Sequence, residues 1–113
     1  MKDRDDRLYL IHIGECLDRI EQYTSAGRDP FFSDTKTQDA VLRNLHILAE
    51  SRQRLSDRLK TSQPQVDWRS IAAFRNVLVH DYLGIDLSRI WDIVQNDLPA
   101  LKRAVADMLA SLN

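Results

Sequence analysis

Apolar residues recur along the chain at three- and four-residue steps, the spacing that places side chains on one face of an α-helix. The first such segment predicts a helix over residues 3–26, in which Ile11 widens the apolar face and Gly27 supplies a natural stop. The predicted inward positions of this helix are Leu10, Ile13, Leu17, Ile20 and Tyr23. A short loop with Phe31 and Phe32 is expected to follow and to close one end of a helical bundle.

A second helix is predicted over residues 35–60, with Ser33 or Asp34 as its N-cap. Its apolar stripe consists of Val41, Leu45, Leu48, Leu55 and Leu59. Arg52 interrupts this stripe, so its side chain is expected either to extend to the edge of the face or to face a partner or a site.

The second half of the chain predicts two or three more helices. Asp67 is a suitable N-cap for a helix over residues 68–80, and Asp86 for another that runs to about residue 95. Because proline is accepted in the first turn of a helix but kinks an interior, Pro99 begins a fifth helix or kinks the end of the fourth. The pattern predicts one all-α domain over residues 1–113, an antiparallel bundle of four to five helices.

Charge and composition limit the classes of function that fit this chain. The chain has 113 residues with 16 Lys plus Arg against 17 Asp plus Glu, whereas a protein that holds nucleic acid by bulk charge is strongly basic. Any RNA contact must therefore come from a local patch. The single cysteine, Cys16, excludes an internal disulfide and the multi-cysteine zinc patterns, and its apolar surroundings indicate core packing. Without a signal peptide or a long apolar run, the expected compartment is the cytoplasm.

The candidate chemistry lies on the predicted helix over residues 68–80. Arg75 and His80 are five residues apart, which on a helix separates them by ~140° around the axis. Asn76 and His80 share a face instead. A site that uses Arg75 and His80 together therefore favours the end of the helix or a second copy across a two-fold axis.

These residue types suit cleavage of an RNA phosphodiester. A histidine near neutral pKa can move the proton of the attacking ribose 2′-OH or of the leaving oxygen, and a guanidinium can hold the phosphate and stabilise its transition state. Asn76 could orient either group, and no metal or other cofactor is required. The spacing alone is also that of an ordinary surface arginine and a helix-capping histidine, so it does not establish catalysis.

Other polar and aromatic residues are weaker candidates. His12 and His46 lie on separate predicted helices and are interpreted as structural or surface residues. Asp39 and Glu50 either support arginines near the site or are simply solvated. The two tryptophans are interpreted as core or interface anchors rather than base-stacking platforms.

The segment from Arg75 through Asn76 and His80 to Tyr82 resembles the R-x4-H-x-Y signature of HepT-like proteins in the HEPN superfamily. The flanking sequences, including residues 67–72 and 82–86, also resemble the family, and the likeness covers nearly the whole chain. One departure lies at residues 49–51, which read Ala-Glu-Ser where members often read Gly-Glu-Ala.

This resemblance implies a homodimeric bundle with paired motifs at its interface. It implies a metal-independent endoribonuclease toxin that cleaves transfer or messenger RNA, with Arg75 and His80 as catalytic residues and Asn76 in support. It also implies an antitoxin partner, a minimal nucleotidyltransferase of the MNT type that adds AMP to Tyr82. Phosphate charge and bulk at Tyr82 would compete with substrate for Arg75.

Two other functions fit the residues. In one, the chain is an interaction module that binds and activates a nucleotidyltransferase and cleaves nothing. In the other, it is a nucleotide-binding or substrate-recruiting subunit in which Arg75 holds a phosphate without turnover. The pairing of Arg75 with His80 favours the enzyme, because binding alone needs no acid–base residue.

Overall fold

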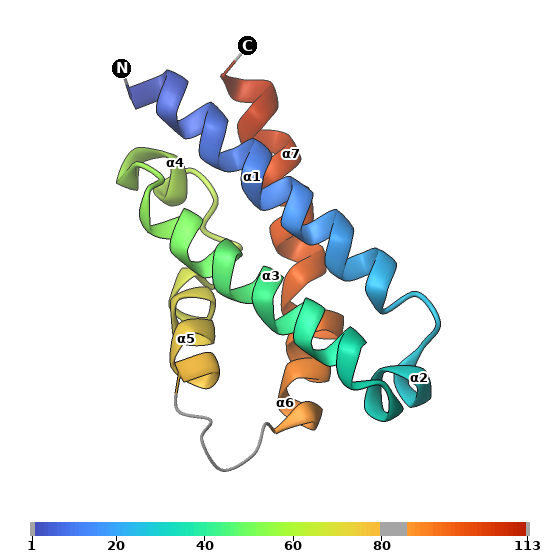
Figure 1. Cartoon of the computed structure of the whole chain (residues 1–113). Helices are drawn as coiled ribbons and strands as arrows, with labels where there is room; N and C mark the ends of the chain where they lie inside the picture. The colour runs from blue at the N-terminus through green and yellow to red at the C-terminus, as the bar shows by residue number, and fades with distance from the viewer. Residues whose placement is uncertain (1, 80–85, 113) are drawn as a thin grey trace.

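Two long helices, α1 (Lys2–Tyr23) and α3 (Thr35–Gln53), pack side by side in the computed structural model (Figure 1). The structure describes the backbone of residues 2–79 and 86–112 and the side chains of residues 4–74 and 86–112. In chain order the described elements are α1 (Lys2–Tyr23), α2 (Arg28–Ser33), α3 (Thr35–Gln53), α4 (Asp57–Thr61), α5 (Trp68–Val79), α6 (Leu87–Asp92), the π-helical segment η1 (Ile93–Asp97) and α7 (Leu98–Ser111). The prediction of an all-α bundle is confirmed, and no described residue lies in a strand.

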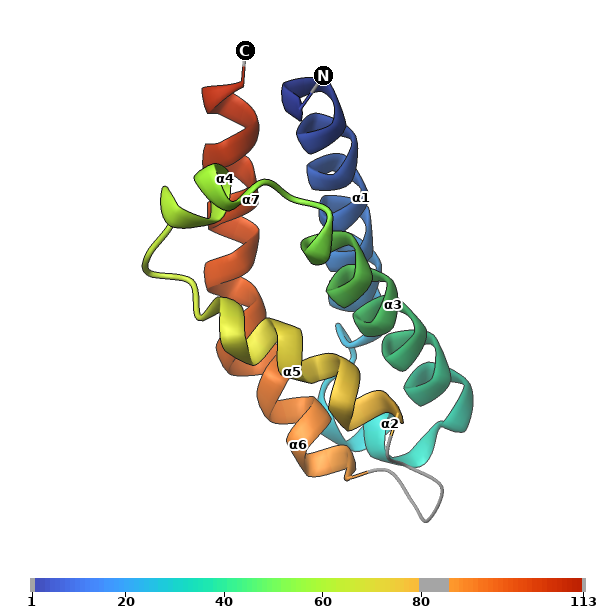
Figure 2. The same cartoon turned by 90° about the vertical axis from the view of Figure 1, so that its left-hand side faces the viewer.

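Helix α5 packs on α3, and α7 packs on α1. The beginning of α1 and the end of α7 lie next to each other in both views (Figure 2), and Arg7 Nη2 donates to the Leu112 carbonyl over 3.2 Å. No helix in the described part of the chain is long and apolar enough to cross a membrane.

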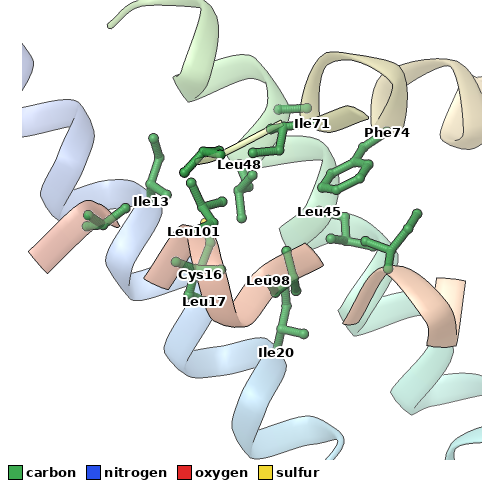
Figure 3. Close-up of a cluster of buried hydrophobic side chains, with 14 of the residues drawn as sticks. Ile13, Cys16, Leu17, Ile20, Leu45, Leu48, Ile71, Phe74, Leu98 and Leu101 are labelled. Carbon is green, nitrogen blue, oxygen red and sulfur yellow. The ribbon is translucent and has the colours of Figure 1, made fainter. Parts of the chain in front are cut away.

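The core joins the inward faces of all the long helices (Figure 3). It includes Leu10, Ile13, Cys16, Leu17, Ile20, Val41, Leu45, Leu48, Leu55, Leu59, Ile71, Phe74, Ile90, Leu98 and Leu101. Burial of Cys16 is confirmed. The prediction that Ile11 and Tyr23 face inward is wrong, because these two residues are 44% and 38% exposed. Ile11 lies ~100° around α1 from Leu10 and so turns away from the core, and Tyr23 is the last residue of α1.

The predicted loop after α1 is wrong in part, because residues 28–33 form the short helix α2. Gly27 separates it from α1 with a φ of 102°, a conformation that glycine adopts without strain. Phe31 does close this end of the bundle: it is buried, with its ring centroid 5.4 Å from that of Trp91. Trp91 thus acts as a core anchor, as expected.

The predicted helix over residues 35–60 is wrong in length, because α3 ends at Gln53 and α4 begins at Asp57. Ser56 caps α4, and its hydroxyl accepts from the Leu59 N–H over 3.4 Å. The apolar spacing continues across the break, since Leu55 and Leu59 are both buried, which is why periodicity alone predicted one helix. The expected cap at Asp34 is confirmed by its bond from the Lys36 N–H at 3.1 Å.

The structure decides whether Pro99 begins a fifth helix or kinks the end of the fourth. Residues 87–111 are helical throughout, and the π-helical segment η1 separates α6 from α7, so Pro99 modifies the fourth long helix rather than starting a detached fifth. In η1 the Leu98 N–H donates to the Ile93 carbonyl, five residues back. This wider turn relieves the clash that a proline ring makes with the carbonyl four residues before it.

Candidate functional site

Helix α5 carries the first part of the predicted motif. Arg75 and Asn76 lie on α5, whereas His80 and Tyr82 lie outside the described residues. The helices before and after residues 80–85, α5 and α6, fix where this segment begins and ends.

The N-terminal end of α5 is held by side-chain hydrogen bonds. The indole Nε1 of Trp68 donates to the Lys60 carbonyl at 2.9 Å and to the Gln63 carbonyl at 3.2 Å. Asp67 caps the helix as predicted, accepting from the Ser70 N–H at 3.1 Å and from its hydroxyl at 2.8 Å. These bonds to the ionised carboxylate lower the pKa of Asp67, with the Ser70 hydroxyl the largest cause.

The middle of α5 is fixed by packing. Ile71 and Phe74 are buried in the core, and α5 rests on α3. Arg75 follows directly after Phe74, so its backbone position is set by a helix held both at its cap and in its core. A site on such an element can be positioned more precisely than one on a free loop.

The chain after the motif is anchored as well. Asp86 caps α6 as predicted, since its carboxylate accepts from the Arg89 N–H at 3.2 Å. The buried side chain of Ile90 then holds α6 in the core. Residues 80–85 therefore join two helices that are each fixed to the same bundle.

A polar groove of about 470 Å³ runs between α5 and the α6–η1 segment. Its lining includes Ser70, Phe74, Asp86, Arg89, Asp92 and Asp97. Burial, and then the nearby charge of Asp67, raise the pKa of Asp97, whereas Arg89 opposes this. Among the described residues, the charged groups that line this groove are the carboxylates of Asp86, Asp92 and Asp97 and the guanidinium of Arg89.

Helix α3 presents buried polar atoms, two of which have no hydrogen-bond partner among the described residues: Asn44 Oδ1 and Arg52 Nε. The side chain of Asn44 is 5% exposed, and its Nδ2 donates to the Ala40 carbonyl at 2.9 Å. Arg52 is half-buried, which fits the expected extension towards the edge of the apolar face. The sequence analysis did not single out Asn44. The only indication of its burial was an asparagine within an apolar stripe.

The remaining candidates lie on α1 and α3. His12 and Asp39 are exposed, and His46 lies 4.0 Å from the Glu50 carboxylate on the same helix, a surface pair. In the described part of the chain, no three His, Cys, Asp or Glu side chains are grouped so that they could hold a metal ion.

Comparison with known proteins shows which family this chain resembles. Residues 13–108 match the family model described as ribonuclease HepT-like. The "Probable ribonuclease HepT" of Thermococcus cleftensis is 36% identical over 100 residues, covering 88% of this chain and 91% of that protein. A "Putative RNase" of Methanocaldococcus jannaschii is 38% identical over 100 residues, covering 88% and 83%.

A further relative from Methanocaldococcus jannaschii is larger. It is named "Gamma-glutamylcyclotransferase and putative RNase" and is 32% identical over 111 residues. The match covers 97% of this chain, which spans 50% of that relative's length. Among solved structures, none matches this chain.

Proposed function

Because this chain belongs to the HepT-like ribonuclease family, we propose that it is a metal-independent endoribonuclease that serves as the toxin of a toxin–antitoxin pair. The observation that carries the proposal is the extent of the family match. Residues 13–108 include all of α5 and the whole segment from Arg75 to Tyr82, so the arginine, histidine and tyrosine of the motif lie inside the matched region.

The proposed reaction is an internal transfer at the RNA phosphate. The ribose 2′-OH attacks the adjacent phosphorus, the bond to the 5′-oxygen breaks, and a cyclic phosphate and a 5′-OH end result. His80 takes the 2′-OH proton or delivers one to the leaving oxygen. Arg75 binds the phosphate oxygens and stabilises their charge in the transition state, and Asn76 orients one of these groups.

The proposed active unit is a homodimer, with the whole chain as one domain in each copy. On a continuous helix, the five-residue spacing of Arg75 and His80 would separate them by ~140°, so one copy would not bring them together on a single face. A two-fold axis near α5 would combine groups from both copies. The proposed substrate is transfer or messenger RNA.

Tyr82 is the proposed control point in the cytoplasm. An MNT-type nucleotidyltransferase antitoxin transfers AMP to its hydroxyl oxygen: the tyrosine oxygen attacks the α-phosphorus of ATP, and pyrophosphate leaves. Each attached AMP adds about one negative charge two residues from His80, which would occupy Arg75 and exclude substrate phosphate.

The test is RNA cleavage by the purified chain with EDTA and, separately, with magnesium. We expect equal cleavage rates in both, with cyclic phosphate ends on the products, because the arginine–histidine mechanism uses no metal. Cleavage that depends strictly on added magnesium would contradict the mechanism, and no cleavage of any RNA would contradict the function.

A further inference from the structure

A second cavity lies away from the motif, between α1 and the junction of η1 with α7. Its volume is about 350 Å³, which is within the range of small-molecule pockets, ~300–1,000 Å³. The apolar residues that line it are Leu17, Val94, Leu98 and Pro99. Its described lining belongs to α1 and the turn after it, to η1 and to α7, whereas the proposed ribonuclease residues lie on α5 and in the segment that follows it.

The wall formed by η1 offers a backbone acceptor. In this π-helical turn the Leu98 N–H donates to the Ile93 carbonyl, so the next bond in the series would run from residue 99 to the Val94 carbonyl. Residue 99 is proline and has no N–H to donate. The Val94 carbonyl therefore lacks this helical partner, and both Val94 and Pro99 line the cavity.

The rim of the cavity carries two cations that differ in their surroundings. Lys102 forms ion pairs with Glu21 and with Asp18, the latter at 3.8 Å from its Nζ. Arg103, the next residue along, has no ion pair with any carboxylate in the described part of the chain. Its exposed guanidinium is thus available for an incoming anion.

We propose that this cavity binds a small organic anion with a compact apolar body, an N–H or O–H donor, and one carboxylate or phosphate group. The apolar body rests on Leu17 and Leu98, the donor bonds to the Val94 carbonyl, and Arg103 binds the anionic group through paired hydrogen bonds. Two kinds of molecule share this chemistry: an aromatic carboxylate and a nucleoside monophosphate.

The test is calorimetric titration of the whole protein with matched probes. Indole-3-carboxylate has an N–H donor, 1-naphthoate has a similar shape without one, and adenosine monophosphate carries a phosphate instead. We expect indole-3-carboxylate to bind more tightly than 1-naphthoate. Tighter binding by adenosine monophosphate would identify a nucleotide as the ligand, and weaker binding would identify a carboxylate.

Three substitutions test whether the probes bind in this cavity. Arg103→Ala should weaken every probe that binds by about tenfold or more, the usual effect of losing a hydrogen bond to a charged group. Arg19→Ala removes an exposed arginine elsewhere on α1 and should change affinity less than about twofold. Pro99→Ala gives residue 99 an N–H for the Val94 carbonyl and should remove the advantage of indole-3-carboxylate over 1-naphthoate.

The proposal is overturned if no probe binds at millimolar concentration, or if Arg103→Ala binds as well as the wild type. Equal losses in Arg103→Ala and Arg19→Ala would also overturn it, because they would indicate general charge attraction. RNA cleavage measured on the same variants should not change, so failure here is distinguishable from failure of the ribonuclease proposal.

Discussion

The carboxylate of Asp6 on α1 accepts two hydrogen bonds from Ser56 at the start of α4, from the backbone N at 2.9 Å and from Oγ at 2.8 Å. Asp6 is 2% exposed, although it is an acidic residue near the N-terminus. The contact fixes the point at which the chain leaves α3, and it holds the first turns of α1 against the rest of the bundle.

Asp6→Ala should therefore lower the free energy of unfolding by about 3 kcal/mol, because it leaves the Ser56 N–H and hydroxyl without their charged acceptor. Asp6→Asn keeps an acceptor oxygen and should cost less. Asp5→Ala changes an exposed neighbour and should cost less than about 0.5 kcal/mol. Urea denaturation measures all three, and an Asp6→Ala variant as stable as Asp5→Ala would show that the contact does not stabilise the fold.

Asp97 is expected to destabilise the protein at neutral pH. Burial and the charge of Asp67 raise its pKa in the folded state, so folding disfavours its ionised form. The penalty is present above that raised pKa and disappears as the pH falls through it. Asp97→Asn should raise the melting temperature at pH 7 and have no such effect at about pH 3, below the ordinary aspartate pKa of ~3.9.

Asp92→Asn is the control for that experiment, since Asp92 lines the same groove but is exposed. Thermal unfolding followed by circular dichroism at both pH values provides the comparison. An Asp97→Asn variant that melts at or below the wild-type temperature at pH 7 would contradict the sign of the effect.

The sequence predicted the long helices well because their apolar spacing and their caps agree. Asp34, Asp67 and Asp86 each cap the helix expected of them, and each accepts from a backbone N–H near the helix start. Local signals of this kind depend on residues three or four positions apart, which a single sequence displays directly.

The features that the sequence did not predict depend on distant contacts. The break between α3 and α4 involves Asp6, which lies fifty positions from Ser56. The burial of Asn44 depends on neighbouring helices, because its local pattern is only that of a polar residue in an apolar stripe.

The proposed homodimer predicts that the mass of the particle in solution is that of two chains. Light scattering at micromolar concentration should give a particle of two chains, each of 13.1 kDa, because a shared site needs both copies. Mixing Arg75→Ala chains with His80→Ala chains should then restore part of the cleavage through mixed dimers. A monomer that cleaves RNA at the full rate would contradict the shared site.

Tyr82→Phe should separate toxicity from its control. Phenylalanine keeps the ring but removes the acceptor oxygen, so the variant should fold and escape silencing by the nucleotidyltransferase. Intact-mass spectrometry after co-expression with that partner should detect AMP adducts on the wild type and none on Tyr82→Phe. Adducts that persist on the variant, or a wild type silenced without any adduct, would place control elsewhere.

The most direct test of the central claim is the RNA cleavage rate of Arg75→Ala and His80→Ala in EDTA, compared with the wild type and with Arg69→Ala, an exposed arginine on the same helix. We expect each motif variant to lose about 10²–10⁴ in rate while its circular dichroism spectrum is unchanged, and Arg69→Ala to cleave at nearly the wild-type rate. Folded Arg75→Ala or His80→Ala protein that cleaves RNA at the wild-type rate would contradict the assignment.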